Sequence, residues 1–184
     1  MKLFLYIFLL TGVTGILTEE GVVPKAFEKK VNRLLKDNFG KETLEIKGIY
    51  FPEANKSFPN RSLFSINRRS EQLGFLVISK ARGCHIGGCD GIIQAENAKY
   101  EDFWYAVILD NAHQILQVKI LDYQSEYGYE ICAKNWLKQF KGFKGCELKY
   151  GSKEVDAISG ATVSAQSIVM DISNLCWLLG RGNE

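Results

Sequence analysis

Residues 103–121 read FWYAVILDNAHQILQVKIL. Seven apolar residues, 103–109, are followed by Asp110-Asn111-Ala112-His113, and a second apolar run begins at Ile115. Two apolar runs of this length joined by a short polar turn are typical of an antiparallel β-hairpin. The stretch therefore predicts strands over 103–109 and 115–121.

On either side of this hairpin, the spacing of apolar residues predicts three further strands and three helices. Gly40 and Gly180 follow the first and last helix as stop signals. Short strands followed by long helices favour an α+β fold, an antiparallel sheet with helices packed on one side. The strands are expected over 44–51, 63–66 and 73–80, and the helices over 24–39, 131–140 and 162–179.

The composition is that of a folded domain without a strong net charge. The chain has 184 residues, 46% of them hydrophobic, and a net charge of +2. These values exclude a disordered or fibrous chain and argue against nucleic acid as a partner. We expect one domain over 71–180, preceded by a small helical and strand extension over 20–70.

The N-terminus has the pattern of an export signal. Lys2 precedes an apolar run over 3–10, and small residues follow over 11–15. Because about 15 apolar residues are too few to span a bilayer, residues 1–15 predict a signal peptide or a short N-terminal anchor. The expected location is extracytoplasmic, either periplasmic or membrane-associated, where disulfides persist.

The stretch that carries the chemistry is DAISGATVS, residues 156–164. It places small and hydroxyl-bearing residues directly before a predicted helix, and the start of a helix favours an anionic phosphate. Gly160 and Ala161 leave room for a bulky group to approach the Thr162 hydroxyl. The alternative is a plain helix N-cap, for which Ser, Thr and Asp are preferred.

This stretch resembles the acceptor motif Asp-x-x-Ser-Gly-Ala-Thr of FMN-binding domains, with Asp156, Ser159, Gly160, Ala161 and Thr162 at its specified positions. Family members include flavin subunits of the sodium-pumping NADH:quinone reductase and of Rnf complexes. The resemblance continues upstream through the hairpin, the stretch 125–129 and the segment around Trp136. The order and spacing of these features agree over about half of the chain.

The resemblance implies that a flavin transferase attaches FMN covalently, through its phosphate, to Thr162. Asp156 is then a recognition residue for that enzyme, and backbone amides around Glu126, Tyr127 and Gly128 hold the flavin edge. Candidates to stack on the isoalloxazine are Tyr127, Tyr129 and Trp136. For Trp136 a core position in an amphipathic helix is an equal alternative.

The five cysteines leave at least one thiol without an intramolecular partner. Cys84 and Cys89 lie in the glycine-rich stretch 83–91, which we expect to be a tight, exposed loop. In order of preference they form a structural disulfide, a redox-active dithiol or part of a metal site. Cys132 and Cys146 are a further candidate pair, and Cys176 is expected to be a buried apolar residue.

Together these features predict an exported flavoprotein electron carrier rather than a stand-alone enzyme. We expect no catalytic residues and no metal, and a redox donor and acceptor that the sequence does not name. One alternative is a thiol–disulfide redox protein that uses Cys84 and Cys89. Another is a flavin-free binding module that keeps only the fold.

Overall fold

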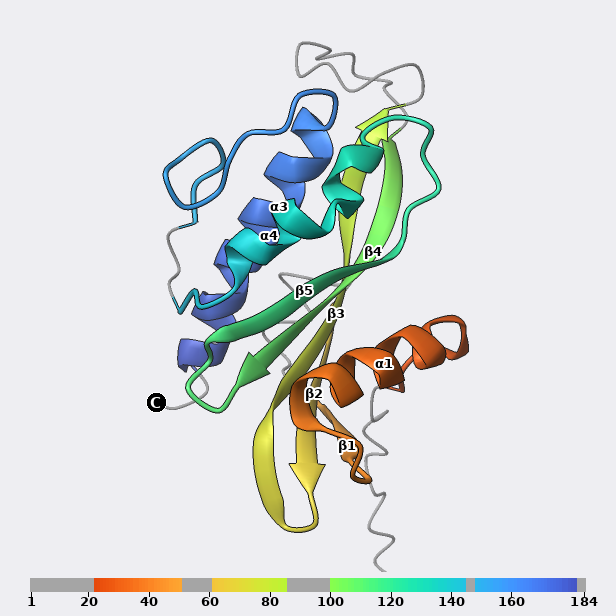
Figure 1. The fold of residues 1–184 in the computed structure, drawn as a ribbon, viewed down its shortest axis with the longest axis vertical. Helices are drawn as coiled ribbons and strands as arrows, with labels where there is room; N and C mark the ends of the chain where they lie inside the picture. Colours follow the sequence, from red (N-terminus) through yellow and green to blue (C-terminus); the bar gives the residue numbers. More distant parts are fainter. Residues whose placement is uncertain (1–21, 51–60, 86–99, 145–147, 182–184) are drawn as a thin grey trace, which may run out of the picture.

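The computed structural model describes residues 22–50, 61–85, 100–144 and 148–181, whose arrangement Figure 1 shows. The expected signal segment 1–15, Cys89 and Cys146 lie outside these residues. In the described ranges, no helix is both long and apolar enough to cross a membrane.

The described part of the chain forms one antiparallel sheet of five strands, in which each strand pairs with the next along the chain. The α+β fold with an antiparallel sheet is therefore confirmed. The strands are β1 (Glu45–Ile49), β2 (Arg61–Arg68), β3 (Glu71–His85), β4 (Tyr100–Asp110) and β5 (Ile115–Asp122).

The hairpin of β4 and β5 has the predicted turn. The Asp110 carboxylate accepts hydrogen bonds from the backbone N–H groups of Ala112 (2.9 Å) and Gln114 (2.8 Å). His113 adopts a positive φ of 58°, which completes the reversal of the chain.

β3 is longer than expected, and this corrects the prediction of an exposed loop from Gly83 onward. Gly83 and Cys84 are buried strand residues, and His85 still pairs with Tyr100 of β4 across a bulge. A Cβ at Gly83 would lie 2.3 Å from the Glu101 carbonyl oxygen. The glycine therefore serves the close approach of two strands rather than a turn.

Helices lie on both faces of the sheet, which corrects the expectation that all of them pack on one side. In β4, Tyr105 and Val107 face the core that includes the C-terminal helix, α4 (Thr162–Arg181). Ala106 and Ile108 point the opposite way, into a second core. Because alternate strand residues point to opposite faces, a strand that is apolar throughout needs cover on both.

The N-terminal segment supplies that second cover. A 3₁₀ turn, η1 (Lys25–Phe27), leads into α1 (Glu28–Phe39), whose Val31, Leu34 and Leu35 are buried in the second core. Their spacing gives one apolar stripe along the helix. α1 packs on β4 and β5, so residues 22–50 and 61–70 belong to the same sheet and cores as the rest of the described chain.

The helix predicted over 131–140 is broken into three short pieces. They are η2 (Tyr129–Cys132), α3 (Lys134–Leu137) and η3 (Lys138–Phe140). The break falls at Ala133, whose ψ of 122° is extended rather than helical.

A buried charge cluster fixes α4 to the sheet. The carboxylate of Asp171, halfway along α4, accepts hydrogen bonds from Arg61 of β2, Ser79 of β3 (2.7 Å) and Tyr105 of β4. The Arg61 and Asp171 side chains are only 5% and 19% exposed. Burial, and then the charge of Asp171, raise the pKa of Tyr105 well above its usual value, so its hydroxyl remains a hydrogen-bond donor.

We predict that Asp171→Asn lowers the free energy of unfolding by about 3–5 kcal/mol, because it leaves the buried Arg61 charge without its carboxylate. Urea denaturation measures the loss. The matched control is Asp102→Asn, since Asp102 forms a half-exposed ion pair with Lys80 at 2.7 Å. The control should lose no more than about 1 kcal/mol. Equal losses in the two variants would contradict the assigned role of Asp171.

Candidate functional site

The acceptor motif forms the loop that enters α4. Thr162 is the first residue of the helix and is half-buried, whereas Ser159 and Gly160 are exposed and Ala161 is buried. The first helical hydrogen bond runs from Ala165 N–H to the Ala161 carbonyl (2.8 Å). Figure 1 shows the loop running back along α4 to the end of the molecule where this helix begins.

Trp136 and Gln139 form hydrogen bonds with Asp156, the first residue of the acceptor motif. The indole N–H of Trp136 donates to the Asp156 carbonyl (2.9 Å), and the Gln139 amide oxygen accepts from the Asp156 backbone N–H (2.7 Å). The Gln139 amide N–H₂ also donates to the Asp156 carboxylate (2.9 Å). Asp156 is thus fixed at both its backbone and its side chain, although its residue surface is exposed.

Trp136 itself belongs to the core. It is 5% exposed, and its ring meets Phe140 edge-on with the ring centroids 5.2 Å apart. This placement agrees with the core alternative that the sequence left open. It leaves no free face of the indole for a stacked ligand.

Tyr150 holds the middle of the loop. Its hydroxyl donates to the Ile158 carbonyl (3.2 Å) and accepts from the Ile158 backbone N–H (2.9 Å). Gly151 N–H also donates to the Val155 carbonyl (2.9 Å), which closes a small turn before the motif. The side chains of Trp136, Gln139 and Tyr150 therefore fix the loop by hydrogen bonds at both ends of Asp156–Ile158.

The stretch 125–129 lies against the first turn of α4. The Tyr123 hydroxyl donates to the Tyr127 carbonyl and lies 3.0 Å from the buried Ser164 hydroxyl. Gly128 is buried at a φ of +79°, and a Cβ there would lie 2.5 Å from both Cys84 Sγ and the Tyr123 hydroxyl. Only glycine fits this position, because side chains are disfavoured by the backbone and by the space.

Burial is the main cause that raises the pKa of Tyr123, and the hydrogen bond with Ser164 opposes this effect. Tyr123 therefore stays protonated and keeps the proton that it donates to the Tyr127 carbonyl.

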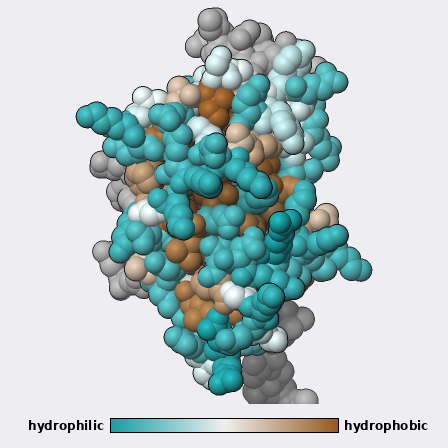
Figure 2. All heavy atoms as spheres, in the orientation of Figure 1, coloured by the Kyte–Doolittle hydropathy of each residue, from teal (hydrophilic) through white to brown (hydrophobic). Residues whose placement is uncertain are grey.

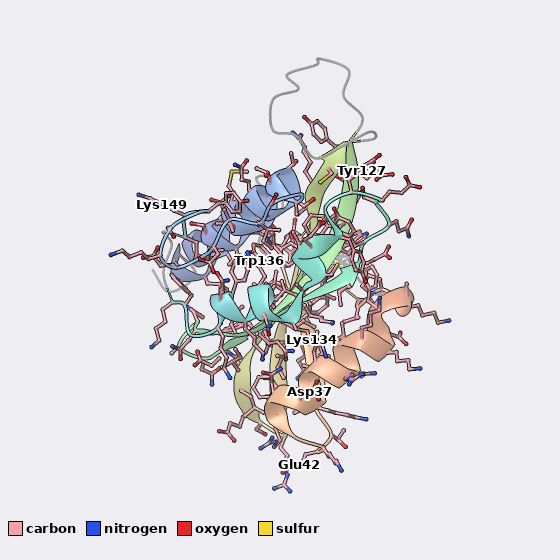
Figure 3. The ribbon with its side chains drawn as sticks, turned by 45° about the horizontal axis from the view of Figure 1, so that its top comes forward. Asp37, Glu42, Tyr127, Lys134, Trp136 and Lys149 are labelled. Carbon is pink, nitrogen blue, oxygen red and sulfur yellow. The ribbon has the colours of Figure 1, made fainter. Side chains whose placement is uncertain are left out.

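Two exposed tyrosines flank this contact. Tyr127 is 43% and Tyr129 is 65% exposed, and Tyr129 meets Tyr123 edge-on at a centroid distance of 6.2 Å. Figure 3 shows Tyr127 at the end of the molecule where α4 begins. Aromatic rings in this position are available to an incoming flat ligand.

Glu130 lies beside the motif glycine. A Cβ at Gly160, whose φ is +82°, would lie 3.1 Å from Glu130 Oε1. The η2 turn and the acceptor motif are therefore in direct contact, although some 30 residues separate them in sequence. Glu130, like Tyr123, Gln139 and Tyr150, was not a candidate from the sequence, because only the folded chain brings these side chains to the motif.

Cys84 approaches the same helix start. It is fully buried, and its sulfur is part of a disulfide whose other cysteine is not among the described side chains. The Ser164 hydroxyl oxygen lies 3.3 Å from Cys84 Sγ. The expected pairing of Cys84 with Cys89 stays a prediction.

Cys132 is a free thiol, which overturns the candidate pairing with Cys146. The side chain packs against the core. Burial is the main cause that raises its pKa, and the nearby charge of Lys119 opposes this effect. Among the described residues, no three His, Cys, Asp or Glu side chains are grouped in a way that could hold a metal ion.

Tyr123, which follows β5, the 125–130 stretch and the acceptor motif thus meet at the start of α4. Residues 99–175 match the family model of the FMN-binding domain. The matched family is the one that the acceptor motif and its flanking elements predicted. A comparison with curated proteins finds no match to the chain.

The FMN-binding domain match begins beside β4 and ends within α4, so it contains Thr162, the acceptor motif and the 125–130 stretch. β1, β2 and β3 precede the matched residues, yet they belong to the same sheet as β4 and β5, which lie within the match. Cys84 is thus a contribution to the site from outside the matched region.

We predict that Gly128→Ala destabilises the protein more than Gly142→Ala. Both glycines have a positive φ, +79° and +90°, which costs an alanine about 1–2 kcal/mol. At Gly142 the nearest neighbour of a new Cβ is 3.9 Å away, whereas at Gly128 two atoms lie at 2.5 Å. Overpacking should add about 1–3 kcal/mol at Gly128 alone, measured by urea denaturation. Equal losses would contradict the tight contact between Gly128 and Cys84.

Proposed function

We propose that the protein is an exported electron carrier in which a flavin transferase attaches FMN, through its phosphate, to the Thr162 hydroxyl. The observation that carries the proposal is the position of Thr162. It stands in a complete acceptor motif, at the first residue of α4, within the matched FMN-binding domain. Thr162 is half-buried, and Ser159 and Gly160 shortly before it in the chain are exposed.

The surroundings of Thr162 suit a phosphate ester. The backbone N–H groups in the first turn of a helix have no partners within it, and the helix dipole favours an anion there by about 0.3–1 kcal/mol. Gly160 and Ala161 present little side-chain bulk beside the hydroxyl. The hydrogen bonds from Trp136, Gln139 and Tyr150 hold the loop in place without a ligand, so little ordering is left for attachment to require.

The exposed tyrosines suit the isoalloxazine ring. Tyr127 and Tyr129 are candidates to stack on it, because flat aromatic faces pack favourably. The backbone N–H groups around Glu126 and Gly128 are then candidates to bind the polar ring edge. FMN, when bound, accepts and donates one or two electrons, and the chain's residues position it and tune its potential.

The disulfide of Cys84 supports an extracytoplasmic location, since disulfides persist mainly in oxidising compartments. The signal-like residues 1–15 point the same way. Covalent attachment also fits export, because a dissociated flavin would be lost from such a compartment. The donor and the acceptor of electrons are then extracytoplasmic or membrane-bound proteins.

We predict that protein co-expressed with a flavin transferase gains the mass of one FMN less one water. Thr162→Ala should abolish this gain, because it removes the oxygen that bonds to phosphorus. Ser167→Ala, a half-buried hydroxyl further along α4, should keep it. Intact-mass spectrometry reads both results, and yellow colour after denaturing purification confirms a covalent bond. An unmodified wild-type mass beside an active transferase would refute the attachment to Thr162.

A second candidate function uses Cys84 and Cys89 as a thiol–disulfide pair. The observation that favours it is the 3.3 Å contact of Cys84 Sγ with Ser164, two residues after Thr162. The full burial of Cys84 favours a structural disulfide instead, because soluble thiols cannot reach its sulfur.

We predict that the number of reactive thiols does not change when the flavin is reduced chemically. Thiol counting under native conditions tests this, with Cys132→Ser used to remove the free thiol from the background. Two new thiols after reduction would favour the second function.

A further inference from the structure

A groove separates α1 from the segment α3–η3, on the side of the molecule away from the acceptor loop. Its floor is formed by β5, and its volume is about 600 Å³. Figure 2 shows this face as largely hydrophilic, with apolar residues in recesses between hydrophilic ones. We call this feature the basic groove.

Basic residues outnumber acidic ones in the lining of the groove. Asp37 is the only acidic residue among the described side chains that line it. Six basic residues oppose it, although the whole chain has a net charge of only +2. They are Lys30 and Arg33 of α1, Lys119 of β5, and Lys134, Lys138 and Lys141 of the α3–η3 side.

These cations are not neutralised within the described protein. Its ion pairs of 4.0 Å or less involve none of the six. Of the six, Lys30 also bonds to the fold in the described residues, because its ammonium group donates a hydrogen bond to the Leu121 carbonyl. Several cations gathered around one hollow repel each other, and an anionic occupant relieves that repulsion.

The α3–η3 segment separates the groove from the acceptor loop. Lys134, Lys138 and Lys141 recur at helical spacing and line the groove. Trp136 and Gln139 hydrogen-bond Asp156 of the acceptor loop. Figure 3 shows Lys134 on the side of α3 that faces α1 and Trp136 on the side that faces α4. An occupant of the groove is therefore about one helix diameter, some 10 Å, from the acceptor loop.

We infer that the basic groove docks an acidic segment of a protein redox partner. The inference rests on the proposed electron-carrier function and names the chemistry of the partner. Charge complementarity speeds the encounter of two proteins and fixes their orientation, which suits a short-lived electron-transfer complex.

The shape of the groove favours a protein segment over a membrane surface. A bilayer presents a broad surface that cannot enter a hollow between two helices, whereas a protruding peptide can. Leu34, Leu116, Val118 and Leu137 also line the groove, so apolar residues lie below the ring of charges. This combination matches an acidic segment that also carries apolar side chains.

The experiment measures binding of a fluorescein-labelled peptide of Glu and Leu by fluorescence anisotropy, with a Gln and Leu peptide as the uncharged probe. The groove variant is Lys134→Gln, Lys138→Gln and Lys141→Gln together. Its control removes the same charge outside the groove, at the exposed Lys25, Lys29 and Lys36. We expect the groove variant to bind the acidic peptide about tenfold more weakly than the control variant does, and added salt to weaken wild-type binding.

Three outcomes overturn the inference. Equal loss in both variants shows general charge attraction, and no binding by the wild type shows that the groove takes no acidic peptide. Groove-dependent binding of phosphatidylglycerol vesicles or of pyrophosphate, without peptide binding, assigns the groove to a membrane or to a small anion. The assay is run on protein with and without attached FMN, and intact mass is recorded for each sample. Failure to load FMN is thereby separated from failure to bind the peptide.

Discussion

The Asp171 carboxylate is the constraint on which the placement of the site depends. It joins the middle of α4 to three neighbouring strands through Arg61, Ser79 and Tyr105. A helix that packs only through apolar contacts can rotate or slide by part of a turn, whereas three directional bonds to one buried carboxylate fix its register. The start of α4, and with it Thr162, is held over the sheet for the same reason.

The fold was largely predictable because its signals are local. The apolar runs of β4 and β5 and the stop at Gly40 each lie within a few residues of the feature that they specify. The predictions that were wrong concern features that depend on residues far away in the sequence. The face that α1 covers is set by Ala106 and Ile108, some 70 residues away, and Gly83 is a strand residue because Glu101 lies against it.

The candidate site, like the fold, has a part that the sequence could predict and a part that it could not. The motif around Thr162 could be identified because its residues are consecutive, and the matched domain contains it. The side chains that position the motif could not, since Gln139, Tyr150 and Tyr123 reach it only through tertiary contacts. A tryptophan at helical spacing also gives no sign of whether its ring faces a ligand or the core, and only the 5% exposure of Trp136 decides this.

The hydrogen bonds between Gln139 and Asp156 bear on the order of maturation. In the folded protein, an enzyme that reads the Asp156 carboxylate meets it with Oδ2 already bonded to the Gln139 amide. In the unfolded chain, the same enzyme would meet a solvated carboxylate on a flexible peptide. The enzyme therefore meets one substrate if the protein folds before modification and a chemically different one if it folds afterwards. Gln139 makes the difference, because its hydrogen bond to Asp156 exists only in the folded protein.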